Sequence, residues 1–327
     1  MRAVLCRDWG PPESLTIEEI ETPEPGPGQV RVRVRAASVN FPDVLIIQQK
    51  YQFKPKLPFS PGSDFAGEIT AVGEGVSGWK TGDRVMGMIG WGAFAEEVLA
   101  DAGRLAPLPE GVDWGVAASF PMVYGTSYHA LVDRGELKAG QTVLVLGAAG
   151  GVGLAAVEIA KAVGATVIAA ASNADKLAVC REHGADHLID YSEGDFRAKL
   201  KEVCPKGPDV IYDPVGGDLA EAAFRSIGWR GRYLVVGFAA GEIPRLPLNL
   251  PLLKNAALVG VFWGAFIANE PDNFRADLKV LIDWLRSGRI KPRIAARYAL
   301  EDAPKAIRAL ADRKVSGKVV VEPGSRG

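Results

Sequence analysis

The stretch Val143-Leu144-Val145-Leu146-Gly147-Ala148-Ala149-Gly150-Gly151-Val152-Gly153 decides the fold of this chain. Four apolar residues run into a glycine-rich turn, and Leu154 to Val163 then has the composition of a helix with few polar residues. A strand, a turn and a helix in this order form the context that a dinucleotide-binding loop requires. Gly150 is expected to leave room for a pyrophosphate, and the amides of Gly151 and Val152 are expected to face it.

The loop departs at one position from the common G-x-G-x-x-G pattern. Ala148 stands at the place of its first glycine, whereas Gly153 is present and is expected to let the helix pack closely on the strand. The segments around the loop therefore carry the prediction of a nucleotide site. The alternative is a tight packing turn in an α/β domain that binds no ligand.

The segments after the loop alternate between apolar strands and helices. Strands are expected at 166–170, 187–189, 209–212 and 232–236, and helices at 173–183, 195–203 and 219–227. Alternation at this spacing predicts the α/β class, with a doubly wound parallel sheet of the Rossmann type. Ligands of such sheets bind beyond the carboxyl ends of the strands.

The residues after the second of these strands indicate which dinucleotide binds. An NAD site usually has Asp or Glu there, about 20 residues beyond the loop, to bond the ribose 2′-hydroxyl. Here the strand ends Ala169-Ala170-Ala171-Ser172-Asn173, and the first acid is Asp175. A 2′-phosphate would meet no carboxylate, and Ser172 with Lys176 can bond it. The sequence favours NADPH over NADH, although a lysine at position 176 is also typical of a solvated helix.

Composition excludes several classes of protein. The 327 residues suffice for two domains with full cores, and 48% hydrophobic with 24% charged residues is typical of a globular protein. A net charge of −1 gives no basic field, so no nucleic-acid partner is expected. The longest apolar run, Val143 to Val157, is too short and too rich in glycine to span a bilayer, so no membrane partner is expected.

Cysteine usage and the first residues bear on the compartment. Cys6, Cys180 and Cys204 are widely spaced and odd in number, which favours a reducing compartment over a disulfide framework. Met1-Arg2 leads directly into an amphipathic strand, so no secretion signal is expected. We expect a cytoplasmic protein.

Residues before about 123 have the pattern of a second, β-rich domain. Val30 to Ala36 alternates apolar and basic residues, as a half-buried strand does, and prolines and glycines punctuate the segment often. Helices at 274–287 and 303–312 and a strand at 317–321 follow the sheet. The expected division is a β-rich domain of residues 1–123 and 266–327 with a nucleotide domain of residues 124–265 inserted in it. Substrate and nicotinamide are expected in a cleft between them.

Four motifs carry a resemblance to a known family. They are Ala37-Ser38-Val39-Asn40-Phe41-Pro42-Asp43, Leu57 to Gly67, Gly82-Asp83-Arg84-Val85 and Ala148 to Gly153. In this order the chain resembles the zinc-independent quinone oxidoreductase branch, the zeta-crystallin-like branch, of the medium-chain dehydrogenase/reductase superfamily. The resemblance implies a Rossmann domain inserted into a GroES-like β-rich domain.

The resemblance also bears on metal. In zinc alcohol dehydrogenases of this superfamily a Cys, a His and a second Cys bind catalytic zinc. Asn40 stands at the position of the first Cys and Ser63 at that of the His, and the lobe with four close cysteines is absent. Zinc needs three or four N, S or O ligands, so no metal is expected. Asp43 and Asp64 remain as carboxylates near the cleft, for which structural hydrogen bonding is the favoured role.

The resemblance supplies the remaining candidate site residues. Asn40 would lie beside the nicotinamide, and Tyr51 would line the substrate cleft, so these two are the candidate catalytic residues. Leu45 replaces a second cleft tyrosine of the branch. Together with the loop, the candidate cofactor-binding residues are Asn40, Thr126, Gly150, Gly151, Val152, Ser172, Asn173, Lys176, Tyr191, Gly237, Phe238, Phe262, Trp263 and Arg313. Tyr191 and Arg313 are implied at the adenine ribose and the 2′-phosphate, while Tyr51 and Trp263 are equally typical of aromatic packing.

Three functions remain open at this point. The first is an NADPH-dependent quinone oxidoreductase, because hydride transfer without a Lewis acid suits an electron-poor acceptor. The second is an NADPH-dependent reductase of enones or enoyl thioesters, and the third is a cofactor-bound binding protein with little turnover. The apolar strand at 257–262 is expected at a sheet edge, where it predicts pairing into a homodimer, as the resembled family does.

Overall fold

The computed structural model describes residues 1–324, which form two compact units. The first unit comprises residues 1–122 and the described chain from Pro292 onward, and the second unit comprises residues 123–291. The first boundary between the units, after Met122, lies one residue from the boundary expected after residue 123. The second lies after Lys291 rather than after residue 265, so helices at 263–286 belong to the second unit.

Specific contacts hold the segment before Lys291 in the second unit. The rings of Tyr128 and Trp284 meet edge to face with centroids 5.7 Å apart. The Arg289 guanidinium lies 4.7 Å from the Trp284 ring centroid. The backbone N–H of Lys291 donates to a carboxylate oxygen of Glu158 at 2.9 Å. The contacts of Tyr128 with Trp284 and of Glu158 with Lys291 join residues far apart in sequence, so a division read from the sequence placed the segment in the other domain.

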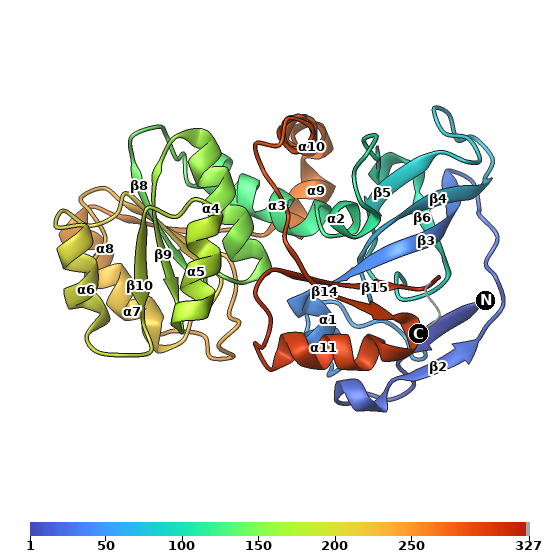
Figure 1. Cartoon of the computed structure of the whole chain (residues 1–327), viewed down its shortest axis with the longest axis horizontal. Helices are drawn as coiled ribbons and strands as arrows, with labels where there is room; N and C mark the ends of the chain where they lie inside the picture. The colour runs from blue at the N-terminus through green and yellow to red at the C-terminus, as the bar shows by residue number, and fades with distance from the viewer. Residues whose placement is uncertain (325–327) are drawn as a thin grey trace. The chain divides into compact units, whose positions relative to one another are not determined.

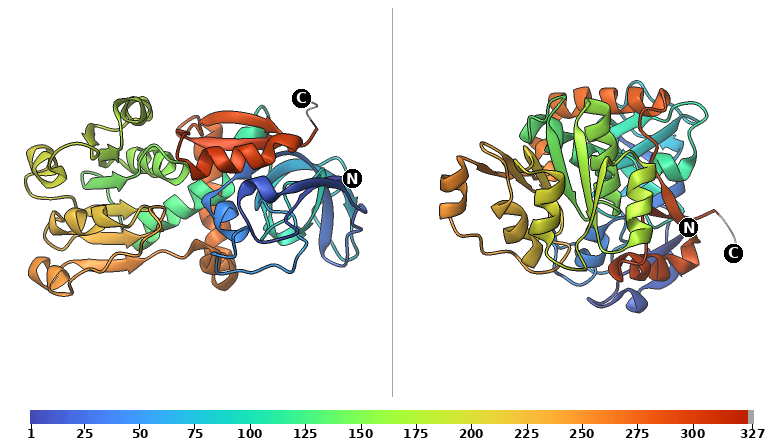
Figure 2. Two further views of the ribbon diagram at one scale, coloured as in Figure 1. Left: turned by 90° about the horizontal axis from the view of Figure 1, so that it is seen from below. Right: turned by 60° about the vertical axis from the view of Figure 1, so that its left-hand side comes forward.

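The first unit is built mainly from antiparallel strands. Its strands are β1 (Arg2–Leu5), β2 (Thr16–Glu19), β3 (Gln29–Val39), β4 (Asp64–Val72), β5 (Arg84–Met88), β6 (Glu97–Asp101), β7 (Leu105–Pro107), β14 (Ile294–Ala299) and β15 (Lys318–Glu322). Strands β1 and β2 pair with each other, and the larger sheet has the order β14-β15-β3-β4-β5-β7, with β6 pairing β3. Helices α1 (Phe41–Ile46), α2 (Trp114–Ala118) and α11 (Ala303–Ala311) accompany it, and α11 runs along β14 and β15 (Figures 1 and 2).

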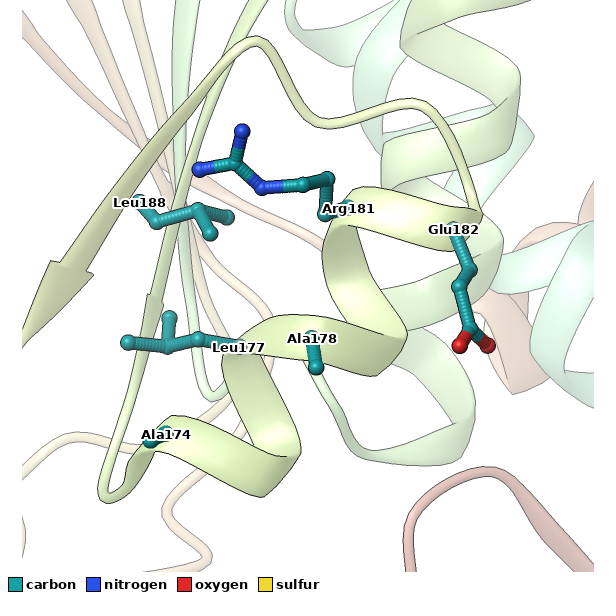
Figure 3. A pocket seen from close by; sticks show the side chains of 6 residues that line it. All are labelled: Ala174, Leu177, Ala178, Arg181, Glu182 and Leu188. Atoms are coloured by element: carbon teal, nitrogen blue, oxygen red, sulfur yellow. The ribbon is translucent and has the colours of Figure 1, made fainter.

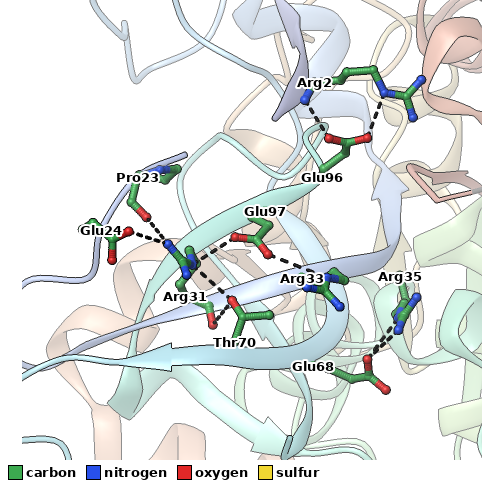
Figure 4. A network of polar contacts seen from close by, with 10 residues as sticks. All are labelled: Arg2, Pro23, Glu24, Arg31, Arg33, Arg35, Glu68, Thr70, Glu96 and Glu97. Atoms are coloured by element: carbon green, nitrogen blue, oxygen red, sulfur yellow. Dashed lines mark hydrogen bonds and ion pairs between the residues drawn. The ribbon is translucent and has the colours of Figure 1, made fainter. Parts of the chain in front are cut away.

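The alternation along Val30–Ala36 is confirmed in β3. Its valines are buried, whereas the arginines between them face outward and meet glutamates of the neighbouring strands (Figure 4). Arg31 Nε lies 3.0 Å from Glu97, and Arg35 Nη2 lies 2.6 Å from Glu68. Opposite charges on adjacent strands stabilise the sheet modestly. They also neutralise part of this row of basic side chains.

The second unit contains the predicted parallel sheet. Its strands are β8 (Thr142–Leu146), β9 (Thr166–Ala171), β10 (His187–Asp190), β11 (Val210–Asp213), β12 (Arg232–Val235) and β13 (Ala257–Gly260). All pairs are parallel, and the order is β10-β9-β8-β11-β12-β13. The chain runs outward from β8 to one edge and from β11 to the other, so the switch point lies between β8 and β11.

Helices lie on both faces of this sheet. The helices between residues 121 and 286 are α3 (Pro121–Tyr128), α4 (Gly151–Val163), α5 (Ala174–Glu182), α6 (Phe196–Val203), α7 (Asp218–Arg225), α8 (Asn249–Lys254), α9 (Trp263–Asn269) and α10 (Pro271–Arg286), and α4 to α7 contact the strands. Figure 1 shows α4 and α5 on one face, and α6 and α7 on the other. The strands β8 and β9 are almost wholly buried, as strands covered on both faces must be. The predicted doubly wound sheet is therefore confirmed.

Within residues 1–324, no helix is both long enough and apolar enough to cross a lipid bilayer.

Candidate functional site

Gly147 makes the turn that opens the glycine-rich loop. Its φ is +57°, in the left-handed region that glycine adopts at little cost. Ala148, at the position that lacks a glycine in the sequence, does not have a positive φ, so it does not need to be glycine. A Cβ on Gly153 would lie 2.4 Å from the Gly147 carbonyl oxygen, which is the close approach predicted for this glycine.

The same loop leaves room beside the start of α4. A Cβ on Gly150 would meet only the Gly147 carbonyl oxygen, at an ordinary 3.4 Å, so protein packing does not require glycine there. Leu154 N–H makes the first bond of α4, to Gly150 O at 2.8 Å. The amides of Gly151 and Val152 therefore lack a partner within the helix. An exposed glycine beside two such donors fits a pyrophosphate.

Two polar side chains hold the start of α4 against the sheet. Ser127 Oγ donates to Val152 O at 2.9 Å and lies 2.9 Å from the Tyr212 hydroxyl oxygen. Ser127 is on α3 and Tyr212 is on β11, and both are fully buried. The neighbouring Thr126 is half-buried on the same helix. Sequence reasoning missed Ser127 and the bond that Tyr212 makes to it.

Two of the residues predicted for the 2′-phosphate, Ser172 and Lys176, lie together at the carboxyl end of β9. Lys176 Nζ donates to Ser172 Oγ at 3.1 Å. Asn173 Oδ1 accepts from the Lys176 backbone N–H at 2.9 Å, so Asn173 caps α5. The Tyr191 N–H donates to Ala171 O at 3.1 Å, which places Tyr191 beside the same strand end. The second unit therefore gathers a hydroxyl, an ammonium and an aromatic residue where the sequence predicted them.

The loops after β8, β11 and β12 also meet. A Cβ on Gly147 would lie 2.7 Å from Val215 Cγ2, so the two turns at the switch point are in contact. A Cβ on Gly216 would lie 2.9 Å from Phe238 Cδ1, so the Phe238 ring covers the turn after β11. Gly237 lies directly before Phe238, in the loop that follows β12. The predicted residues Gly237 and Phe238 thus lie at the edge of the sheet where such folds bind ligands.

Trp263 packs inside the second unit. It is 5% exposed, and a Cβ on Gly125 would lie 2.3 Å from its Cζ2. Its ring also meets Phe274 edge to face at 5.9 Å. Trp263 therefore has a role in aromatic packing, which is the alternative that the sequence left open. The adjacent Phe262 is 54% exposed.

A shallow apolar depression lies elsewhere on the second unit (Figure 3). It is formed by one face of α5 and by β10, and its lining residues are Ala174, Leu177, Ala178, Arg181, Glu182 and Leu188. None of them is a predicted site residue. The glycine-rich loop with its convergent donors, rather than this depression, is therefore the candidate nucleotide site.

A buried polar network surrounds Asn40 in the first unit. Asn40 lies between β3 and α1 and is 4% exposed. Its Nδ2 donates to Asp64 Oδ2 at 3.1 Å and to Ser38 O at 3.4 Å. Its Oδ1 accepts from Lys318 Nζ at 2.5 Å, and Lys318 Nζ also donates to Val39 O at 2.8 Å.

Asp43 closes the turn that begins α1. Its Oδ2 accepts from the Asn40 N–H at 2.7 Å and its Oδ1 from the Gly62 N–H at 3.1 Å. Burial raises the pKa of Asp43 to about 6, although these backbone donors oppose the shift. Asp43 thus has the structural hydrogen-bonding role that the sequence favoured.

Burial also shifts the other two ionisable groups of this network. It raises the pKa of Asp64 to about 7, although Lys318 and Asn40 oppose the shift. It lowers the pKa of Lys318 to about 8, although Asp64 and Asp43 oppose the shift. Perturbed groups of this kind are common at functional sites.

Two buried hydroxyl oxygens of this part of the first unit, Ser38 Oγ and Ser63 Oγ, have no hydrogen-bond partner within residues 1–324. In the described part of the chain, no group of three or more His, Cys, Asp or Glu side chains could hold a metal ion. The donor set at Asn40 and Ser63 is hydroxyl and amide, which zinc does not favour.

The two remaining predicted residues lie at other places in the first unit. Tyr51 follows α1, is half-buried and meets Phe53 edge to face at 5.9 Å. Burial and the charge of Asp43 raise the pKa of Tyr51. Arg313 is exposed on the turn after α11, with a φ of +57°.

Sequence reasoning missed Lys318. It was expected only as part of the last strand, yet it is 5% exposed and bonds Asn40, 278 residues earlier in the chain. The available signal was a lysine directly before Val319-Val320-Val321, since lysine is almost never fully buried without a partner.

Two protein-family models match the chain. The alcohol dehydrogenase GroES-like domain matches residues 26–110, and the zinc-binding dehydrogenase domain matches residues 151–285. They fall on the antiparallel sheet of the first unit and on the parallel sheet of the second.

Individual relatives match nearly the whole chain. The quinone oxidoreductase-like protein 2 of Bos taurus is 40% identical over 322 residues, covering 98% of this chain and 92% of its own. A mycobacterial protein solved as a complex with NADPH is 32% identical with a TM-score of 0.92, covering 99% of this chain and 100% of its own. The Escherichia coli quinone oxidoreductase, also solved with NADPH, is 29% identical with a TM-score of 0.92 and the same coverage. This chain is an NAD(P)-dependent oxidoreductase of the quinone oxidoreductase-like branch of the medium-chain dehydrogenase/reductase superfamily.

Proposed function

We propose that this protein uses NADPH to reduce quinones and does so without zinc. The observation that carries the choice of cofactor is the contact of 3.1 Å between Lys176 Nζ and Ser172 Oγ at the end of β9. No carboxylate stands between Ala169 and Ala174, so nothing repels a 2′-phosphate there. The relatives solved with NADPH support the same choice.

The second unit would hold the dinucleotide at the carboxyl edge of its sheet. The amides of Gly151 and Val152 would bind the pyrophosphate, and Ser172 and Lys176 would bind the 2′-phosphate. Gly237, Phe238 and Phe262 remain candidates for the nicotinamide end. When bound, this cofactor supplies the hydride.

The residues around Asn40 suit an acceptor that is already electron-poor. Hydroxyl and amide groups at positions 40 and 63 cannot polarise a carbonyl as a Lewis acid does. A quinone does not need this help, because the charge it gains is shared by both oxygens. The second Asn40 N–H reaches Ser38 O only at 3.4 Å, so this long bond can be exchanged for a developing oxyanion. Tyr51 would shape the wall of the acceptor site.

An acceptor panel tests the proposed function. Initial rates of NADPH oxidation should be measurable with simple para- and ortho-quinones, and no NADP⁺ reduction is expected with ethanol. If quinones are not reduced but a conjugated enone or enoyl thioester is reduced rapidly, the function is carbon–carbon double-bond reduction instead. No turnover with any acceptor, despite bound NADPH, would indicate a binding protein.

Removal of metal is expected to leave activity unchanged. Asn40 and Ser63 offer no thiolate or imidazole, so dialysis against a strong chelator should not alter kcat. Metal content by mass spectrometry, measured before and after dialysis, provides the control. Activity that is lost on dialysis and restored by zinc would contradict this expectation.

We also propose a homodimer formed through β13, an edge strand of the parallel sheet. Large apolar side chains on β13 and on the segment that leads into it are exposed, and they are Leu248 (79%), Leu252 (76%), Leu253 (63%) and Leu258 (40%). Exposed apolar residues beside an unpaired strand favour association with a second copy. A twofold axis would place the same strand of both copies together.

Leu258→Asp is expected to dissociate this dimer. A twofold axis would bring two carboxylates into an apolar contact, where like charges disfavour pairing. Light scattering at micromolar concentration should give a dimer mass for the wild type and a monomer mass for the variant. Val72→Asp, at an exposed apolar residue of the first unit, is the matched control and should remain dimeric. A monomeric wild type would contradict the proposal.

The free cysteines are consistent with a cytoplasmic protein, which we propose. Cys6 and Cys180 are buried, and burial raises the thiol pKa of Cys6 to about 11 and that of Cys180 to about 12. Thiols of this kind are poorly reactive and need no disulfide partner.

A further inference from the structure

The amide of Asn40 lies between a buried cation and a buried carboxylate. Lys318 Nζ contacts its oxygen at 2.5 Å, and Asp64 Oδ2 contacts its nitrogen at 3.1 Å. Lys318 is 5% exposed, Asn40 4% and Asp64 0%. The ammonium uses its two hydrogen bonds on uncharged oxygens, those of Asn40 and Val39.

Strand register creates this arrangement. β15 pairs β3 with Val319 opposite Val39, and β3 pairs β4 with Ser38 opposite Asp64. Residues from three adjacent strands therefore converge at the end of β3. The Asn40 amide is held there from both sides by side chains of one sheet, Lys318 of β15 and Asp64 of β4.

The flanking charges permit only one orientation of the amide. An ammonium can only donate and an ionised carboxylate can only accept. Between the pKa of Asp64, about 7, and that of Lys318, about 8, both groups are charged, so the Asn40 oxygen must face Lys318 and the nitrogen must face Asp64. The opposite orientation would place NH₂ against NH₃⁺ and C=O against COO⁻. The same charges polarise the amide, which makes its N–H groups better donors.

We propose that Lys318 is a positioning residue that, with Asp64, locks the Asn40 amide with its second N–H directed toward the reacting oxygen. This inference rests on the proposed function, because it assigns Asn40 to that oxygen. Burying a lysine is costly unless it is well bonded. A role in setting one side chain accounts for its presence at the start of an otherwise apolar strand.

The orientation of the Asn40 amide is expected to depend on pH. Three ionisable groups face this amide or its partners: Asp64 on β4, Asp43 on α1 and Lys318 on β15. Burial lowers the pKa of Lys318 to about 8. As pH rises through about 8 the ammonium loses a proton, and Asn40 Oδ1 loses its charged donor. We expect kcat to fall along this limb, and the limb to be absent in Lys318→Met.

Lys318→Met is the first test, with Lys305→Met, an exposed lysine of α11, as the matched control. The side-chain amide resonance of Asn40, assigned by its absence in Asn40→Ala, should shift in Lys318→Met. The kcat should fall about 10- to 100-fold, as misplacement of a reacting group does, while the KM for NADPH stays unchanged. Lys318→Arg should recover part of the kcat, and Lys305→Met should behave as the wild type does.

A double variant keeps the inference testable if Lys318→Met does not fold. Lys318→Met with Asp64→Asn removes the two buried charges that contact the Asn40 amide, so no unpaired ion is left against it and the variant is expected to fold even where the single variant does not. It should still show a shifted Asn40 resonance and a low kcat. An unchanged Asn40 resonance, or a folded double variant with wild-type kcat, would overturn the inference. A wild type that reduces no acceptor would instead overturn the proposed function, because the resonance reports on the lock without turnover.

Discussion

Asn40→Ala is expected to lower kcat for quinone reduction by about 10²- to 10³-fold, the cost of removing an oxyanion donor. The variant loses the N–H whose long bond to Ser38 O, at 3.4 Å, can be exchanged for the substrate oxygen. It also leaves Lys318 and Asp64 without the amide that joins them, which costs stability of about 1–3 kcal/mol per unsatisfied group. Kinetics should therefore be measured well below the thermal midpoint determined for each variant.

Tyr51→Phe is the comparison for Asn40→Ala. Tyr51 is half-buried and packs edge to face on Phe53 at 5.9 Å, and phenylalanine keeps that packing. The kcat of Tyr51→Phe should remain closer to the wild-type value than that of Asn40→Ala. The opposite order would mean that the Tyr51 hydroxyl, rather than the Asn40 amide, acts on the substrate.

Lys176→Ala is expected to weaken NADPH binding by roughly 5- to 100-fold and to leave NADH binding nearly unchanged. A hydrogen bond to a charged group contributes about 1.5–3 kcal/mol, and solvent screening reduces this where the group is exposed. Calorimetric titration of both cofactors gives the two dissociation constants. Arg313→Ala should act in the same direction, as the family resemblance implies.

Lys201→Ala on α6 is the matched control for Lys176→Ala, because Lys201 is an exposed helix lysine of the same unit. Its cofactor affinities should equal those of the wild type. Equal wild-type affinity for NADPH and NADH would contradict the assignment of the Ser172–Lys176 pair to the 2′-phosphate.

The fold of the second unit could be predicted because its signals are local. Apolar runs of strand length alternate with helices, and the elements at 166–171, 187–190 and 232–235 fall within one or two residues of their predicted bounds. The pattern G-x-G-x-x-G was a poorer guide, because Gly147 makes the left-handed turn one residue before the expected position. Turn geometry depends on φ, which a spacing pattern does not specify.

The features that could not be predicted depend on contacts between distant segments. The bond between Lys318 and Asn40 requires β15 to pair β3, and no local pattern indicates that pairing. The extension of the second unit to Lys291 depends on the bond from its N–H to Glu158. The outward arginines of β3, by contrast, followed from a period of two residues and were predictable.

The central claim is that NADPH bound to this chain reduces a quinone directly. Stopped-flow spectroscopy of wild-type protein premixed with equimolar NADPH, and then with a simple para-quinone, an enone or an enoyl thioester, measures single-turnover loss of NADPH absorbance. We predict the fastest decay with the quinone, and slower decay when NADPH carries deuterium at the transferred position. A bound NADPH that persists with the quinone but decays with the enone or the thioester would contradict the claim.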